Sequence, residues 1–170
     1  METHSNTTPV YQVLLFLFRA LFTIFALMTT VFIFQNSLEI GAISSARSEA
    51  FTALVNGYLS TMGLPTLTNA IVRKMAHFAE YAMLGFWFTL CLRVYTTRYI
   101  RHISWPLLLV LGIANVDETL QLYVANRSGS VRDVWIDFFG GCSGILLGLL
   151  LVMLLGGFWY LMGFGRHKRA

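Results

Sequence analysis

The chain has 170 residues, of which 56% are hydrophobic, 15% are aromatic and only 12% are charged. This composition excludes an ordinary soluble domain and is typical of an integral membrane protein with a single compact unit. The net charge of +4 does not indicate nucleic-acid binding, because the basic residues lie beside apolar segments. There they determine topology and contact anionic lipid headgroups.

Four apolar segments are long enough to cross the ~30 Å hydrocarbon core as helices. They cover about residues 11–34, 72–95, 103–123 and 134–163. The first segment is too long for a signal peptide and lacks a small-residue cleavage site, so we expect no cleavage there. The fourth segment has small-xxx-small spacings that predict close helix packing, at Gly140, Gly141, Gly144 and Gly148.

A connector of mixed character, residues 38–70, separates the first two spans. Part of it has the i, i+3, i+4, i+7, i+8 spacing of an amphipathic helix, at Phe51, Leu54, Val55, Tyr58 and Leu59. This segment is too short and polar to span, so we expect it to lie on the membrane surface. The predicted fold is therefore all-α: a four-helix integral membrane bundle with an interfacial helix between spans one and two.

Basic residues predict the topology. They occur in the loop after the second span and in the C-terminal tail, as Arg93, Arg98, Arg101, Arg166, Lys168 and Arg169. With four spans these two regions lie on the same side, and the excess of positive charge places them in the cytoplasm. Both termini are then cytoplasmic, and the connectors at 35–72 and 124–133 face outward.

Five of the eight acidic residues lie inside or at the edges of predicted spans, where an ionised side chain costs at least ~2.5–3.5 kcal/mol. In the second span Arg73, His77 and Glu80 have i, i+4, i+7 spacing and share one helix face, which Tyr81 borders. The predicted topology brings three polar clusters to one depth near the outer leaflet. Their other members are Lys74 in the second span, Asp117, Glu118 and Gln121 in the third, and Arg127, Arg132, Asp133 and Asp137 around the start of the fourth.

Several carboxylates beside a histidine can bind a divalent cation or carry out acid–base chemistry, and the sequence leaves both open. The candidate catalytic residues are His77, Glu80, Asp117 and Glu118. Arginines can hold phosphate or carboxylate groups through two hydrogen bonds, so the remaining cluster members are candidate binding residues. Two structural explanations also stay open. Glu80 could pair with Arg127 or Arg132 as a salt bridge inside the bundle, and Asp133 could cap the fourth span.

Four motifs resemble the VanZ-like family: FQNS at the end of the first span, RKMAHFAEYAMLG, DETLQ and RSGSVRDVWIDFFGG. The resemblance covers about residues 31–150. It implies a set of characteristic polar positions, namely Gln35, Ser37, Arg73, Lys74, His77, Glu80, Tyr81, Asp117, Glu118, Gln121, Arg127, Asp133 and Asp137. The chain departs from the family pattern at Ile113–Asn115, where a Tyr or Ser is usual, and at Asn126, where Gly usually precedes Arg127.

The namesake of the VanZ-like family is associated with resistance to teicoplanin, a glycopeptide antibiotic that acts on the cell wall. The resemblance and the polar clusters together predict a multi-pass protein of the bacterial cell membrane. We expect it to bind an anionic lipid-linked wall precursor or phospholipid, either with or without chemical modification of that lipid. The glycopeptide antibiotic itself is a further candidate partner. The alternatives are a noncatalytic accessory protein that limits drug access and a small transporter. Acidic residues on one side of the membrane rather than at its midplane disfavour transport.

Overall fold

A computed structural model describes residues 9–161, and the regular secondary structure in this part of the chain is all helical. Its helices are α1 (Pro9–Leu38), α2 (Gly41–Thr61), α3 (Asn69–Tyr95), the short 3-10 helix η1 (Tyr99–His102), α4 (Ser104–Gln121) and α5 (Val131–Leu161). The predicted all-α class is confirmed. Residues 162–163 of the predicted fourth span lie outside the described residues, as do the tail residues Arg166, Lys168 and Arg169.

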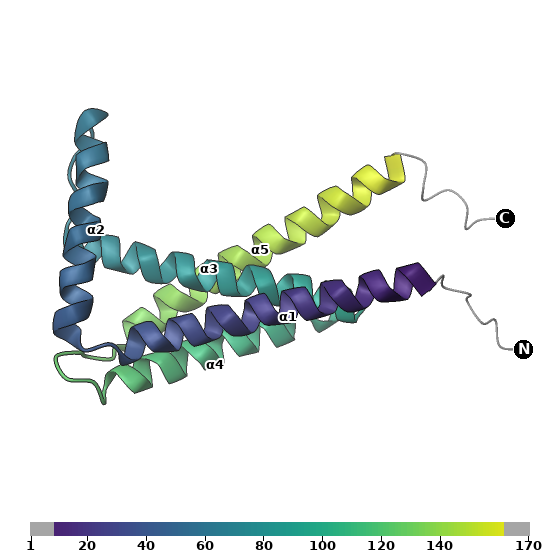
Figure 1. Cartoon of the computed structure of the whole chain (residues 1–170), viewed down its shortest axis with the longest axis horizontal. Helices are drawn as coiled ribbons and strands as arrows, with labels where there is room; N and C mark the ends of the chain where they lie inside the picture. Colours follow the sequence, from purple (N-terminus) through teal and green to yellow (C-terminus); the bar gives the residue numbers. More distant parts are fainter. Residues whose placement is uncertain (1–8, 162–170) are drawn as a thin grey trace, which may run out of the picture.

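Helices α1, α3, α4 and α5 lie alongside one another, and α2 stands across them at one end (Figure 1). Helix α3 contacts all three of its long neighbours, α1, α4 and α5. The first residue of α1 and the last residue of α5 lie at the end away from α2. We call the opposite end, where α1 passes into α2, the α2 end.

Within the described residues, three helical segments are long and apolar enough to cross a membrane: Pro9–Leu38, Tyr99–Gln121 and Val131–Phe158. They correspond to the first, third and fourth predicted spans. Helix α3 has 27 residues, enough to cross, but it carries the polar cluster around His77 and is not among the three. Composition alone therefore supports three spans.

The helix boundaries near α2 have clear local causes. Helix α2 ends at Thr61 and is followed by Gly63, whose φ of 70° is the left-handed conformation that glycine adopts without steric cost. The N–H of Leu64 donates to the carbonyl of Leu59 at 2.9 Å and that of Gly63 to Ser60 at 3.1 Å, which is the Schellman pattern. Helix α3 then begins after Thr68, whose hydroxyl accepts from the N–H of Ile71.

Glycines let α3 and α5 pack backbone to backbone, as the sequence predicted. A side chain at Gly144 would collide with the carbonyl of Ala82, and one at Gly140 with the carbonyl of Phe78. Small residues at such positions allow helices to approach closely within a membrane. Because of this contact, the first turns of α3 and α5 are held next to each other, and their polar residues meet.

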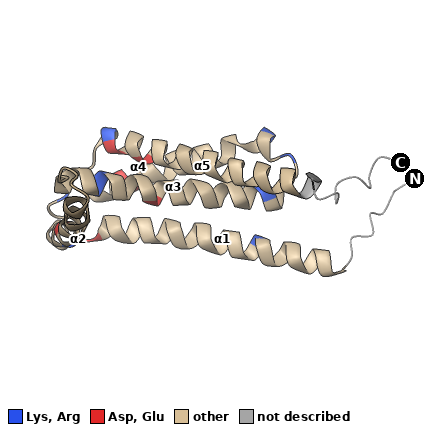
Figure 2. Cartoon of the chain, turned by 90° about the horizontal axis from the view of Figure 1, so that it is seen from above, with Lys and Arg blue, Asp and Glu red and all other residues tan. Residues whose placement is uncertain are grey.

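Helix α2 includes the predicted amphipathic segment and extends it toward its N-terminus. Phe51, Leu54 and Tyr58 are all more than half exposed, whereas Thr52 is buried and accompanies Ser48 in hydrogen bonds to the Asn69 amide. One face of α2 is thus attached to the start of α3, and the other presents apolar side chains. Figure 2 shows that the acidic residues of the described chain gather toward the α2 end, whereas basic residues occur at both ends.

Candidate functional site

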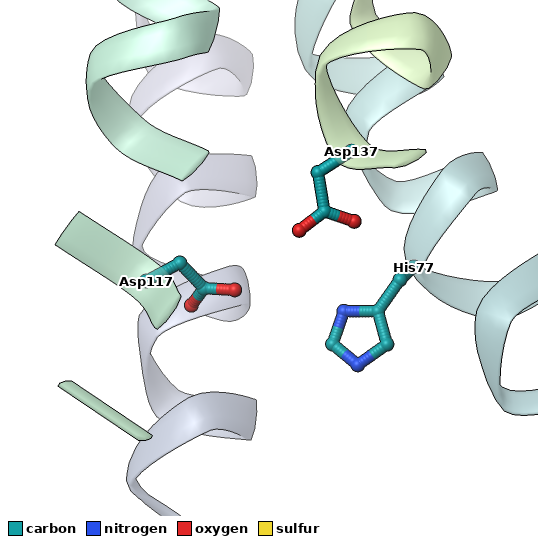
Figure 3. A group of neighbouring side chains, drawn as sticks. All are labelled: His77, Asp117 and Asp137. Atoms are coloured by element: carbon teal, nitrogen blue, oxygen red, sulfur yellow. The ribbon is translucent and has the colours of Figure 1, made fainter. Parts of the chain in front are cut away.

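Two aspartates from neighbouring helices are completely buried at the α2 end. Asp117 of α4 is 0% exposed and Asp137 of α5 is 1% exposed. Both carboxyl groups point toward the ring of His77 on α3 (Figure 3). One potential ligand atom from each of the three residues lies within 4.8 Å of the other two. Three helices far apart in sequence therefore bring ionisable groups to one point.

Asp117 is held by a chain of hydrogen bonds from α1 and α4. The hydroxyl of Ser37 donates to Asp117 Oδ1, and the amide of Gln121 donates to Ser37 Oγ at 3.3 Å. Ser37 is itself 0% exposed, at the last turn of α1. The second oxygen, Asp117 Oδ2, is buried without a hydrogen-bond partner, and the buried hydroxyl of Tyr81 lies beside this carboxyl group.

Glu118 has a different environment from Asp117, although the two are adjacent in sequence. The backbone N–H of Ser130 donates to Glu118 Oε2 at 2.7 Å, and Gln121 donates to Oε1 at 3.4 Å. Gly129 packs directly against the carbonyl of Glu118, where a larger residue would collide. Both carboxylate oxygens have partners, so Glu118 connects α4 to the segment that enters α5.

Glu80 is hydrogen-bonded to α1 rather than ion-paired. The amide of Asn36 donates to Glu80 Oε1 at 3.1 Å, and Glu80 Oε2 is buried without a partner. The side chains described form two ion pairs, Lys74–Asp133 at 2.7 Å and Arg47–Glu39 at 2.8 Å. Glu80 therefore forms no salt bridge with Arg127 or Arg132, the two partners that the sequence left open.

Two arginines near these acids, Arg73 and Arg127, have no ion-pair partner among the described residues. Arg127, in the connection between α4 and α5, donates to the hydroxyl of Ser44 on α2 at 2.6 Å. Burial lowers the pKa of the Arg127 guanidinium, and the positive charge of Arg73 acts in the same direction. A nearby negative charge would stabilise the charged guanidinium of Arg127, but no carboxylate of the described residues contacts it.

Two hollows adjoin the buried acids. The inner cavity has a volume of about 20 Å³ and is lined by Arg73, Lys74, His77, Glu118, Gln121, Asp133, Ile136 and Asp137. The groove has a volume of about 470 Å³ and is lined by Phe32, Asn36, Ser44, Arg47, Ser48, Phe51, Val72, Arg73, Ala76, His77, Glu80 and Arg127. Arg73 and His77 line both, so they stand between the buried carboxylates and the larger opening.

The family model described as VanZ/LLP1 matches residues 4–155, nearly the whole chain. The chain belongs to the VanZ/LLP1 family. No curated protein and no solved structure matches it. Membership in the VanZ/LLP1 family supports a membrane protein linked to antibiotic resistance. The three apolar segments independently support a location in the membrane.

Most of the polar positions implied by the VanZ-like resemblance meet at the α2 end, but two predicted site residues point elsewhere. Gln35 is exposed and lines neither hollow. It lies two residues, or about 200° of helix rotation, from the buried Ser37, so both cannot face inward. Arg132 is also exposed, at the start of α5, and it too lines neither hollow. Asp133 lies in the first turn of α5, and there it pairs with Lys74.

The structure adds four residues that sequence reasoning missed: Asn36, Ser44, Arg47 and Ser130. Ser44, Arg47, Ser48 and Thr52 have i, i+3, i+4, i+8 spacing, so they form the polar face of the helix whose apolar face was predicted. That spacing was the available signal. Ser130 contributes its backbone N–H, for which side-chain identity carries no signal.

The departure of this VanZ/LLP1 chain at Asn126 has a backbone explanation. Asn126 has a φ of 60°, in the left-handed region. Glycine adopts this conformation most readily and asparagine tolerates it better than most residues. The carbonyl of Asn126 packs against Gly41 at the start of α2. The replacement therefore preserves the turn that places Arg127 beside Ser44.

Proposed function

We propose that the groove binds the phosphate-bearing headgroup of an anionic, lipid-linked envelope component, either a wall precursor or a phospholipid. The observation that carries this proposal is the composition of its walls. Three guanidinium groups line the groove, from Arg47, Arg73 and Arg127, and two of them have no carboxylate partner within residues 9–161. Guanidinium groups recognise phosphate with paired hydrogen bonds, so the site suits a headgroup of this charge and shape.

The apolar part of the groove supports a lipid rather than a free anion. Phe32, Phe51 and Val72 line it beside the arginines, and Phe51 is more than half exposed on α2. An acyl or polyprenyl chain attached to the headgroup would lie along these side chains and continue into the bilayer. His77 and Glu80, which also line the groove, supply groups that acid–base modification of a bound headgroup would require.

The membrane placement that accompanies this proposal has four spans, in the bacterial cell membrane. Helix α3 would be the fourth span, because it lies among α1, α4 and α5 and turns His77 and Glu80 toward its neighbours. Helix α2 would lie at the outer surface with its exposed apolar side chains in the interface. Both termini would be cytoplasmic, and the groove would open outward. Acidic residues toward one end rather than at the middle favour binding over transport.

Cysteine labelling tests this topology. Ser128 and Thr97 are both exposed, in the connections after α4 and α3. A membrane-impermeant maleimide applied to intact cells should label Ser128→Cys and spare Thr97→Cys, in a chain whose Cys91 and Cys142 have been replaced. Gly129 would be a poor labelling position, because it packs against the carbonyl of Glu118. Labelling of Thr97→Cys but not Ser128→Cys would show that the groove opens to the cytoplasm.

Replacing Arg73 with glutamine tests the binding function directly. We expect Arg73→Gln to weaken binding of a polyprenyl diphosphate or phosphatidylglycerol about tenfold, because one charge-assisted contact of about 1.5 kcal/mol is lost. Binding would be measured on protein in phosphatidylcholine nanodiscs. Arg132→Gln is the matched control, since Arg132 is exposed and lines neither hollow. Equal weakening by both substitutions would mean that the lipid is attracted by overall charge rather than held in the groove.

This proposal also addresses the association of the family's namesake with teicoplanin resistance. A protein that holds a lipid-linked wall precursor would alter how the drug reaches its target. A noncatalytic accessory protein would do so by binding alone, and an enzyme by changing the bound headgroup. Both versions need the same groove, so the binding experiment tests their common part.

A further inference from the structure

Five buried side-chain atoms of the cluster have no hydrogen-bond partner among the described residues: Glu80 Oε2, the Tyr81 hydroxyl, His77 Nδ1, Asp117 Oδ2 and Asp137 Oδ2. The last three belong to the residues whose potential ligand atoms lie together. Buried polar atoms in folded proteins almost always have a partner, and leaving a carboxylate oxygen without one costs free energy. All three atoms belong to side chains that point toward one another (Figure 3). One cation placed between these side chains would give all three atoms a partner.

We propose that His77, Asp117 and Asp137 bind a divalent transition-metal ion. The proposal goes beyond the function proposed above and does not depend on it. One imidazole nitrogen with two carboxylate oxygens is a donor set that suits Mn²⁺, Fe²⁺ or Zn²⁺ better than Ca²⁺, which takes oxygen ligands. At metal–ligand bonds of about 2.0–2.2 Å, ligand atoms lie roughly 3–3.5 Å apart. The present spacing is within 4.8 Å, so the ion would draw the three side chains inward.

The surroundings of Asp117 are those of a positioned metal ligand. Ser37 donates to its Oδ1, and Gln121 donates to Ser37, which leaves Oδ2 directed away from these bonds. Metal-ligating carboxylates are commonly held in this way by a second layer of hydrogen bonds. Ser37 and Gln121 are therefore positioning residues for the ion, and their burial is explained by that role.

The local charge also calls for a divalent cation. Four carboxylates gather around the site: Asp117, Asp137, Glu118 and Glu80. The positive charges left to balance them are Arg73 and Arg127, which have no ion-pair partner in the described part of the chain, because Lys74 and Arg47 are paired with other acids. When all four carboxylates are ionised, two negative charges are in excess. A divalent cation neutralises them without requiring two of the carboxylates to be protonated.

A small cavity adjoins two of the three proposed ligands. The inner cavity, which His77 and Asp137 line, has a volume of about 20 Å³, and about 10–15 Å³ is enough to hold one water-sized particle. Three protein ligands leave coordination positions open. Because His77 also lines the groove, these positions are adjacent to the proposed headgroup site.

Metal binding would be tested on full-length protein in nanodiscs, with its affinity tag removed and its metal stripped by a chelator. We expect uptake of one Mn²⁺ or Zn²⁺ per chain. Asp137→Asn and His77→Gln should reduce the affinity by more than Ser37→Ala, which should reduce it ~10- to 100-fold. Glu49→Gln is the control, since Glu49 is an exposed acid of α2 outside the cluster, and it should bind as the wild type does.

A spectroscopic measurement keeps the test decisive if an aspartate variant fails to fold. Pulsed EPR on wild-type protein loaded with Mn²⁺ should show coupling to a nitrogen nucleus, and His77→Gln should abolish it. Uptake below one ion per chain by folded wild-type protein would overturn the proposal. So would wild-type affinity in Asp137→Asn, or a nitrogen coupling that survives His77→Gln. Lipid binding is measured separately on the metal-free protein. If it persists there, the proposed function holds whether or not the metal uptake and EPR results support the metal site.

Discussion

Gly144→Ala is expected to destabilise the protein by about 3 kcal/mol, the upper part of the range for overpacking in a close-packed interior. The added Cβ would collide with the carbonyl oxygen of Ala82 on α3. A backbone atom cannot rotate away as a side chain can, so the two helices must separate. Unfolding by a denaturing detergent, followed by loss of helical circular dichroism, would measure the change in the free energy of unfolding.

Gly156→Ala provides the matched control on the same helix. Among the described residues, no atom outside the neighbouring backbone of α5 lies within 4 Å of the position that a Cβ would take at Gly156, so this substitution should be neutral or stabilise by up to ~1 kcal/mol through helix propensity. The comparison separates the packing effect from the backbone effect of removing a glycine. Equal stability of the two variants would mean that α3 and α5 do not approach as closely as described.

The Gly144→Ala substitution should also weaken binding at the candidate site. The contact between α3 and α5 sets the separation of His77 and Asp137, which lie within one or two turns of the Gly140–Phe78 contact. A variant that remains folded but has these helices pushed apart should therefore bind the metal and the lipid probe more weakly than Gly156→Ala does.

Arg127→Lys is expected to weaken binding of polyprenyl diphosphate or phosphatidylglycerol by ~10- to 100-fold, although the charge is kept. Hydrogen bonds to charged groups contribute ~1.5–3 kcal/mol, and lysine lacks the planar fork that makes two of them at once. The hydrogen bond from Arg127 Nη2 to Ser44, 2.6 Å long, holds the guanidinium in one orientation, which an ammonium group cannot reproduce.

Binding isotherms in phosphatidylcholine nanodiscs would measure this effect, with Arg132→Lys as the control of equal charge at an exposed position. Teicoplanin susceptibility of cells expressing each variant gives a second readout. If Arg127→Lys binds as tightly as the wild type while expressing normally, the headgroup is held by charge alone and the paired hydrogen bonds are not part of recognition.

Sequence patterns alone were enough to predict the helices and the place where the polar residues gather. Apolar runs longer than a membrane crossing determine where α1, α4 and α5 lie, because helix length and hydrophobicity are local properties. The rise of 1.5 Å per residue then brings His77, Asp117 and Asp137 to a similar depth from three separate segments. The motifs that carry the VanZ-like resemblance lie in and beside these helices, and the family match over residues 4–155 confirms the resemblance.

Only the tertiary structure decided which of these residues are partners. A helix turns by about 100° per residue, so its own sequence does not specify which side packs against a neighbour. This is why Ser37 and Asn36 reach Asp117 and Glu80, while the predicted Gln35 faces away.

The same reason separates two acids that are adjacent in sequence. Glu118 receives hydrogen bonds from Ser130 and Gln121, whereas Asp117 keeps one oxygen unpaired in the centre of the cluster. The close approach of α3 and α5 through Gly140 and Gly144 places Asp137 opposite His77. Pairing between distant segments depends on how the helices pack, and that information is not contained in the periodicity of any one of them.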